Sequence, residues 1–428
     1  MEPQVIFGIS VFTICFILIS SDKISKTVTA MGGASIFLAT SIISQERAFE
    51  EVDWNVVFLL ISMMLIVGIT KETGLFEYVA IKMAKIAKGS PFKIMLLLCL
   101  ITAVFSAFLD NVTTVLILTP ITILIAVELG LSPIPFILAE IMASNIGGTA
   151  TLIGDPPNIM IGSAAHLSFL SFIQNLSPVI IVILAIYCVW IYFVWGKDMH
   201  VSNQKKARIM EFDEKQSLKN RPLLIKCLVI IGLVIVGFLG HSALHLEAAT
   251  ISLVGASALM LWTGEKHVEK FFHEVEWETI FFFIGLFILV GGLVELGVIN
   301  WMAQSLLDLT AGNITTTSIL ILWSSGVLSG LVDNIPYVAT MIPLVEQFMQ
   351  DPSVANDPRI GSLWWSLALG ACLGGNATLI GASANVVAAG IANKSGYKIS
   401  FLEFTKYGIV ITIISLAVCT GYLLLFFL

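Results

Sequence analysis

Long apolar stretches separated by short polar segments run through this 428-residue chain. About 17–25 predominantly apolar residues suffice for a helix to cross a lipid bilayer. The pattern therefore predicts an all-α polytopic membrane protein with about ten transmembrane helices. These fall near 4–21, 27–44, 55–71, 135–165, 173–195, 222–240, 246–263, 278–296, 362–392 and 406–428.

Two further apolar stretches, 92–127 and 315–349, have a polar pair at their centre, Asp110-Asn111 and Asp333-Asn334. A charged residue at the centre of a simple span is costly in lipid. A re-entrant helical hairpin whose tip is covered by protein avoids most of that cost. We therefore expect two re-entrant hairpins, and the alternative for each is a pair of conventional spans joined by a short loop.

The composition agrees with a lipid-facing surface, because 57% of the residues are hydrophobic and only 12% are charged. A soluble domain carries about twice that share of charged residues. The six cysteines are scattered without metal-ligand spacing, so we expect neither a metal site nor a cofactor. Basic residues do not cluster with aromatic ones, and nucleic-acid binding is therefore not indicated.

The positions of the basic residues predict the orientation of the chain. If the N-terminus lies outside, only Arg47 and Arg359 of the 22 Lys and Arg residues fall in outside loops, and 22 − 2 = 20 fall inside. Inside loops of membrane proteins are enriched in Lys and Arg. We therefore expect a multi-pass protein of the inner (plasma) membrane, with both termini outside (periplasmic) and the polar linker 196–221 in the cytoplasm.

The two halves of the chain resemble each other. Asp110-Asn111 corresponds to Asp333-Asn334 (333 − 110 = 223), and GGTATLIGDPPN at 147–158 corresponds to GGNATLIGASAN at 374–385 (374 − 147 = 227). Each half contains five crossings and one hairpin, and an odd number of crossings inverts the second copy. We expect inverted repeats at 1–195 and 222–428, an architecture typical of secondary transporters with a site at the midplane.

The matching Gly-rich segments predict broken helices within 135–165 and 362–392. Gly147, Gly148, Gly374 and Gly375 permit close backbone approach, and Pro156-Pro157 disrupts the helix in the first half. The hydroxyls of Thr149, Thr151 and Thr378 supply further oxygen ligands beside the exposed carbonyl groups. Asp155 adds a carboxylate that the second half lacks, since Ala382 stands in its place.

Four carboxyl groups are candidates for proton coupling: Asp110, Asp155, Asp333 and Glu140. Such groups in a membrane can bind a cation or carry a proton. The alternative for the three Asp residues is capping of short helices, and for Glu140 it is an ion-paired position near the inner interface. No Lys or Arg lies within the hairpins or breaks away from the membrane ends, which favours a cation, a proton or an uncharged solute over an organic anion.

At DNVTTVLILTP (110–120), SNIGGTATLIGDPPN (144–158) and GGNATLIGASAN (374–385) the chain resembles the ion transporter superfamily. Within it, the chain looks like the branch of the bacterial arsenite permease (ArsB), the NhaD-type sodium/proton antiporters and the P protein. The resemblance implies an alternating-access carrier, often a homodimer, and some arsenite permeases use an accessory ATPase. It also implies that the site is lined by Asp110, Asn111, Thr113, Asn145, Thr149, Asp155, Asn158, Asp333, Asn334, Asn376 and Asn385.

The sequence thus favours a secondary active transporter that is not an enzyme and has no catalytic residues. Our leading expectation is efflux of arsenite or antimonite coupled to proton influx. The alternatives are a sodium/proton antiporter, with Na⁺ or H⁺ as the coupling ion, and a dicarboxylate or citrate carrier. A nucleotide-binding G-x-x-x-x-G-K-[ST] motif does not occur in the chain, so the driving force is expected to be an ion gradient.

Overall fold

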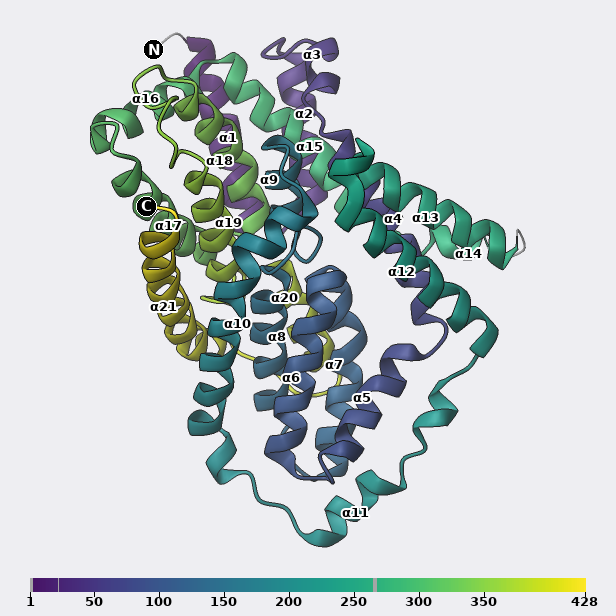
Figure 1. Ribbon diagram of the computed structural model, residues 1–428. Helices are drawn as coiled ribbons and strands as arrows, with labels where there is room; N and C mark the ends of the chain where they lie inside the picture. Colours follow the sequence, from purple (N-terminus) through teal and green to yellow (C-terminus); the bar gives the residue numbers. More distant parts are fainter. Residues whose placement is uncertain (1–2, 22, 265–267) are drawn as a thin grey trace.

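The computed structural model describes residues 3–21, 23–264 and 268–428, and every regular element in these ranges is helical (Figure 1). Within them, nine helices are long and apolar enough to cross a membrane. These are α1 (Pro3–Ser21), α4 (Trp54–Lys71), α6 (Pro91–Phe108), α7 (Asn111–Glu128), α10 (Phe169–Val194), α12 (Arg221–Leu244), α15 (Trp277–Glu295), α17 (Ile314–Leu331) and α21 (Phe401–Phe426). The chain is therefore a polytopic all-helical membrane protein, as the hydrophobic pattern predicted.

Each predicted hairpin consists of two helices joined by a two-residue turn. α6 and α7 meet at Leu109-Asp110, and α17 meets α18 (Asn334–Met349) at Val332-Asp333. Both Asp residues cap the second arm, because Asp110 accepts the Thr113 N–H at 2.8 Å and Asp333 accepts the Ile335 N–H at 3.0 Å. Both residues therefore cap helices, which is compatible with a role in ion binding, and re-entry into the membrane from one side stays a prediction.

Both predicted helix breaks are present. α8 (Ile134–Gly148) is separated from α9 (Pro156–Ala164), and α19 (Ser362–Gly374) is separated from α20 (Ser383–Lys394). Asp155 and Ala382 have nearly the same extended backbone, with φ of −145° and −147°. The second break forms without the proline pair. Paired glycines are common to both, and a Cβ on Gly154 would lie 2.4 Å from the Gly148 carbonyl oxygen.

Two short amphipathic helices were not predicted: α5 (Leu75–Ile86) and α16 (Val298–Thr310). Each follows a glycine with positive φ, Gly74 at 76° and Gly297 at 71°, and buries one face. The hydrophobic pattern missed them because one face of each is polar and neither is long enough to span a bilayer.

The packing exchanges elements between the two halves of the sequence. α2 (Lys26–Ala39) from the first half packs against α15 from the second, and α13 (Ala248–Thr263) from the second half packs against α4 from the first. Figure 1 shows α4, α12, α13 and α14 (Val268–Phe272) as an arm that leaves the main body. We call α2 with α15, and α13 with α4, the frame pairs. Each of these four helices therefore packs against a helix from the other half of the sequence.

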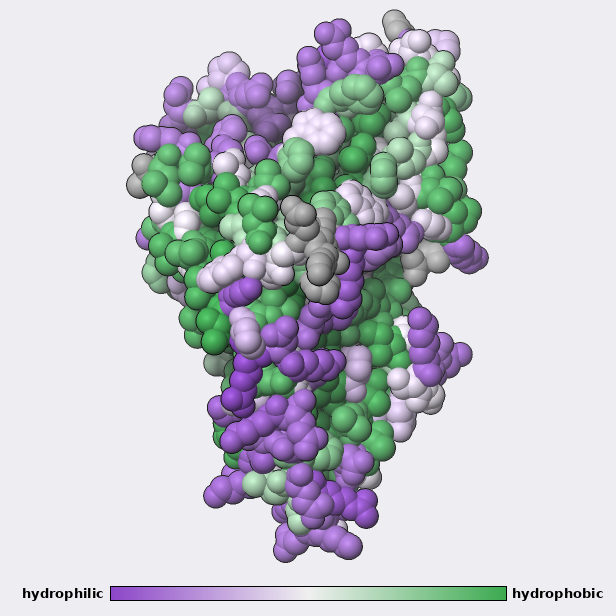
Figure 2. Space-filling model, turned by 90° about the vertical axis from the view of Figure 1, so that its right-hand side faces the viewer, coloured by the Kyte–Doolittle hydropathy of each residue, from purple (hydrophilic) through white to green (hydrophobic). Residues whose placement is uncertain are grey.

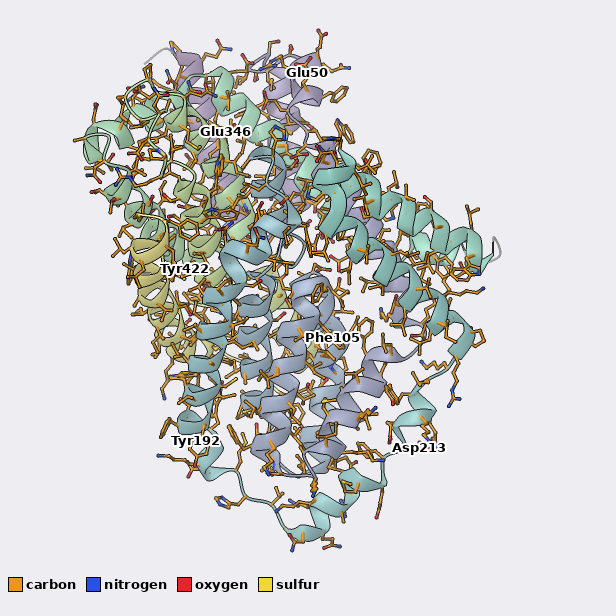
Figure 3. All side chains as sticks on the ribbon, viewed as in Figure 1. Glu50, Phe105, Tyr192, Asp213, Glu346 and Tyr422 are labelled. Carbon is orange, nitrogen blue, oxygen red and sulfur yellow. The ribbon has the colours of Figure 1, made fainter. Side chains whose placement is uncertain are left out.

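The linker contains η1 (Gly196–Asp198), α11 (Asn203–Glu211) and η2 (Glu214–Ser217), and it runs below the bundle from α10 to α12 (Figure 1). The marked N- and C-terminal ends and α3 (Gln45–Glu50) lie toward the opposite end. Glu50 and Asp213 mark the two ends in Figure 3. Figure 2 shows hydrophilic residues at the upper end and in a band that runs from the middle of this face to the lower end, with hydrophobic surface on both sides of the band. The broad hydrophobic surface suits a chain that crosses a membrane.

Candidate functional site

Four asparagine side chains meet at the centre of the molecule. Asn145 of α8 donates to the Oδ1 atoms of Asn376 and Asn385, at 2.9 and 2.8 Å, and accepts from Asn111 Nδ2 at 3.2 Å. Asn111 and Asn145 belong to the first half, and Asn376 and Asn385 to the second. This asparagine cluster is buried. The arrangement follows from packing across the halves, since α7 lies against α20 and α18 lies against α9.

Asn158 and Asn385 hold the two breaks in the same way. The Asn158 amide donates to the carbonyl oxygens of Thr149 and Thr151 at 3.2 and 2.8 Å. The Asn385 amide donates to those of Gly375 and Thr378 at 2.8 and 2.9 Å. Some of the backbone carbonyl groups that we expected to face a ligand are therefore hydrogen-bonded within the protein.

The remaining oxygen of each of these asparagines has a different donor in the two halves. Asn385 Oδ1 accepts from Asn145, whereas Asn158 Oδ1 accepts from the Cys372 thiol at 3.4 Å. Cys372 occupies the position in the second half that Asn145 occupies in the first. The thiol is therefore part of the central polar network.

Asp155 connects the first break to the tip of the second hairpin. Asn334 Nδ2 lies 3.3 and 3.2 Å from the two carboxylate oxygens of Asp155, and the Asp155 side chain is 1% exposed. The equivalent pair in the other half would be Ala382 and Asn111. Alanine cannot accept a hydrogen bond through its side chain, and Asn111 donates to Asn145 instead.

A lysine reaches the second hairpin tip, which corrects the expectation of a site without fixed cations. Lys26 Nζ lies 2.6 Å from Asp333 Oδ2, and Ser383 Oγ donates to the same oxygen at 2.6 Å. Asp333 is 2% exposed. Lys26 is 307 residues from Asp333 in sequence and begins α2, so inspection of the hairpins and breaks alone missed it.

A cavity of about 230 Å³ lies beside this ion pair. Its polar lining includes Lys26, Ser383 and the carboxylates of Asp110, Glu276 and Glu278. Six helices begin at or next to its wall, namely α2, α7, α9, α15, α18 and α20. Glu276 and Glu278 were not among the predicted site residues, because they lie outside the hairpins and breaks on which the prediction was based.

The structure places several predicted ligands in structural roles. The hydroxyls of Thr149, Thr151 and Thr378 donate to the carbonyl oxygens of Asn145, Ala107 and Gly330, respectively. Thr113 contributes its backbone N–H to the Asp110 cap. Gly147 and Gly374 are needed for close packing, because an added Cβ would lie 2.2 Å from the Ala103 oxygen or 2.6 Å from the Gly326 oxygen.

Glu140 lies in the middle of α8 and is fully buried. Neither of its carboxylate oxygens has a hydrogen-bond partner among the described residues, and Thr122 of α7 is a polar side chain close to it. The expectation of an ion-paired glutamate at the interface is therefore wrong. A buried carboxyl group without partners costs folding free energy, so Glu140 remains a candidate for a functional role.

The chain is similar to known membrane transporters in sequence and in fold. The chain is 44% identical to the uncharacterized transporter Rv2684 of Mycobacterium tuberculosis over 422 residues, 98% of this chain and 97% of that one. It is 32% identical to the human P protein over 99% of this chain and 60% of that protein. The structure of the Alcanivorax borkumensis YdaH transporter has the same fold, with a TM-score of 0.61 at 12% identity over 99% of both chains.

The P protein was one of the relatives that the motifs suggested, and these matches do not single out the arsenite permease or NhaD groups. The profile of the citrate transporter family (CitMHS) matches residues 16–370. That match covers well over half of the chain and includes both hairpins and the first break. This chain is therefore a membrane transporter that belongs to the CitMHS citrate transporter family.

Proposed function

We propose that the chain exchanges a small monovalent cation for protons across the cytoplasmic membrane by alternating access. The observation that carries this proposal is the acidic cavity. Three carboxylates, Asp110, Glu276 and Glu278, line it together with one lysine. The lysine is already paired with Asp333. An excess of carboxylate oxygens attracts a cation or a proton and repels an anion.

Asp110 and Asp155 have different roles in this proposal. Asp110 lines the cavity and takes the cation or proton that enters it. Asp155 is buried and is held by Asn334 from the other half. A change in the charge of Asp155 alters a contact between the halves, and this links ion binding to their relative movement.

An organic anion is a second candidate, because six helix N-termini and Lys26 face the cavity. Helix N-termini favour anions. However, Asp110, Asp155, Glu276 and Asp333 precede four of those helices as their N-cap residues. These carboxylates offset the positive ends, and an anion would have to enter together with cations.

Arsenite or antimonite efflux, our leading expectation from sequence, loses one of its two supports. It relied on the resemblance and on a site without fixed cations, and Lys26 is such a cation. The asparagine amides that would bind solute hydroxyls donate to each other. One feature still favours it: the Cys372 thiol lies in the centre, and thiol sulfur is a good ligand for soft metal centres.

Purified protein in proteoliposomes with an internal pH indicator distinguishes these functions. We expect Na⁺ or Li⁺, added outside, to dissipate an imposed proton gradient, and Asp155→Asn to abolish the effect. Asp357→Asn is the matched control, since Asp357 lies in a loop and pairs with Arg359. Dissipation by citrate or by arsenite, without a response to Na⁺, K⁺ or Li⁺, would replace cation exchange with the corresponding alternative.

A further inference from the structure

Each frame pair lines a cavity together with a broken helix, and we call these two places the corners of the molecule. The two corners are equivalent in sequence. Gly33-Ala34-Ser35 in α2 matches Gly255-Ala256-Ser257 in α13 (255 − 33 = 222), and this offset pairs Lys26 with Ala248 (248 − 26 = 222). On the partner helices, Glu278 and Phe282 of α15 correspond to Asn55 and Leu59 of α4 at the offset of 223. Cavities lie at both corners, one beside Lys26 and a small one of about 30 Å³ beside Ala248.

The residues of the two broken helices that line the two corners do not correspond in sequence. At the Lys26 corner, α20 contributes Ser383 and Val387, which correspond to Pro156 and Met160 at the offset of 227. At the Ala248 corner, α9 contributes Ile159, Gly162 and Ser163, and Leu152 of the preceding break also lines the cavity. The difference is about three residues, or roughly 5 Å at 1.5 Å per residue. One half is thus displaced along its frame pair relative to the other.

Under the alternating access proposed above, each half would adopt the register that the other half has here. If the halves exchange registers, the start of α2 faces the positions equivalent to Ile159 and Gly162, which are Val386 and Ala389 (159 + 227 = 386; 162 + 227 = 389). Lys26 then lies about one helical turn from Ser383 and loses Asp333. It remains on the frame beside Glu278, to which its neighbours Ser25 and Thr27 are hydrogen-bonded.

We propose that Lys26 is a tethered counter-cation for Asp333, engaged in the state seen here and replaced by the transported cation or proton in the opposite state. The proposal rests on the alternating access of the proposed function. Ala248 supplies no charge at the equivalent position, so Asp110 depends on the transported ion while Asp333 depends on Lys26. The lysine therefore biases the carrier toward the present state when no ion is bound.

Site-directed cross-linking tests this role without relying on transport. Thr27→Cys with Val387→Cys reports the present state, since both residues line the Lys26 cavity. Thr27→Cys with Ala389→Cys reports the exchanged state. We expect Lys26→Ala to shift the ratio of the two cross-links about tenfold toward the second pair, which corresponds to about 1.4 kcal/mol, and Lys26→Arg to leave it unchanged.

Asp333→Asn separates a specific pair from a general defect. It should shift the cross-link ratio as Lys26→Ala does, and the double variant should shift it no further, because both changes remove one interaction. Equal ratios in all backgrounds would overturn the role of Lys26. Failure of Na⁺ or Li⁺ to dissipate a proton gradient, with the cross-link shift present, would overturn the proposed function and leave the movement intact.

Discussion

The two helix breaks and the two hairpin turns share local backbone geometry but differ in their ionisable groups. Asp155 and Ala382 share their extended conformation, and the turns at Asp110 and Asp333 cap their helices alike. The first half holds its extra acids, Asp155 and Glu140, on the broken helix and break themselves. The second half holds its carboxylate with a lysine from the frame. The matched positions thus share their backbone geometry, whereas their ionisable groups differ.

The shared backbone is where a substitution should have the largest effect. A Cβ at Gly147 would lie 2.2 Å from the Ala103 oxygen, and one at Gly374 would lie 2.6 Å from the Gly326 oxygen. Because these neighbours are backbone, they cannot yield by a rotamer change. We expect Gly147→Ala and Gly374→Ala to destabilise the protein by about 3 kcal/mol or more, measured as loss of folded protein in detergent.

Gly390→Ala is the control for both, since nothing lies within 4 Å of a Cβ there. Alanine also favours a helix over glycine. If Gly147→Ala is as stable as Gly390→Ala, close contact between the helices is not what requires glycine. If only one of Gly147→Ala and Gly374→Ala destabilises the protein, the backbones of the two halves are less equivalent than their geometry indicates.

Asn145 and Cys372 test the asymmetric part of the centre. Asn145→Cys removes two hydrogen bonds donated to Asn376 and Asn385 and one accepted from Asn111. Each buried polar group that loses its partner costs about 1–3 kcal/mol, so we expect a loss of about 3 kcal/mol in thermal unfolding. Cys372→Asn keeps a donor for Asn158 and should cost less than Asn145→Cys, about 1–3 kcal/mol for the newly buried amide. Equal losses would mean that the centre tolerates neither exchange.

Much of this site could be predicted from sequence because the repeat made it visible twice. A polar pair within an apolar stretch and a Gly-rich segment recur at constant offsets, and the structure places both pairs and both breaks in one region. Lys26 could not be found in this way. Its counterpart is Ala248, so the repeat carries no matching signal, and the exchanged packing of α2 onto α15 is set by tertiary contacts.

Hydrogen-bond partners were harder to predict than positions. The threonine hydroxyls were expected to face a ligand, yet Thr149 and Thr378 donate to the backbone carbonyls of Asn145 and Gly330. Buried polar groups pair within the protein wherever a partner is in reach. A sequence shows which polar side chains are present but not which of them form hydrogen bonds within the fold.

Glu140 offers a sharper test of why the halves diverged. Its position in the second half is Leu367 (367 − 140 = 227), and both are fully buried. Glu140→Leu removes a carboxyl group that has no hydrogen-bond partner among the described residues. We expect this variant to be more stable by about 1–3 kcal/mol and to exchange protons about tenfold more slowly.

The measurements are thermal unfolding in detergent and proton flux in proteoliposomes, with Leu367→Met as the matched control. A variant at Glu140 that is more stable and fully active would show that the carboxyl group has no part in transport. A variant that is less stable would show that Glu140 has a stabilising interaction after all. Either result would leave Asp155 as the distinguishing acid of the first half.

The linker lacks a counterpart in the repeat and should show the smallest effect. Lys85 of α5 donates to Glu214 at 2.6 Å and to the Phe212 carbonyl at 3.0 Å, which holds the linker against α5. The hydrogen bond from Lys85 lowers the pKa of Glu214. A lowered pKa stabilises the docked linker above the ordinary pKa of glutamate, and this contribution disappears as the pH falls through the lowered value.

Proteolysis at pH 7 should cut the linker of Glu214→Gln a few-fold faster than that of the unsubstituted chain, and Glu211→Gln should be cut at the unsubstituted rate. In acid, hydrogen exchange of the linker should be the same in Glu214→Gln and in the unsubstituted chain. Faster proton exchange in Glu214→Gln would instead mean that the linker restrains the movement of the two halves.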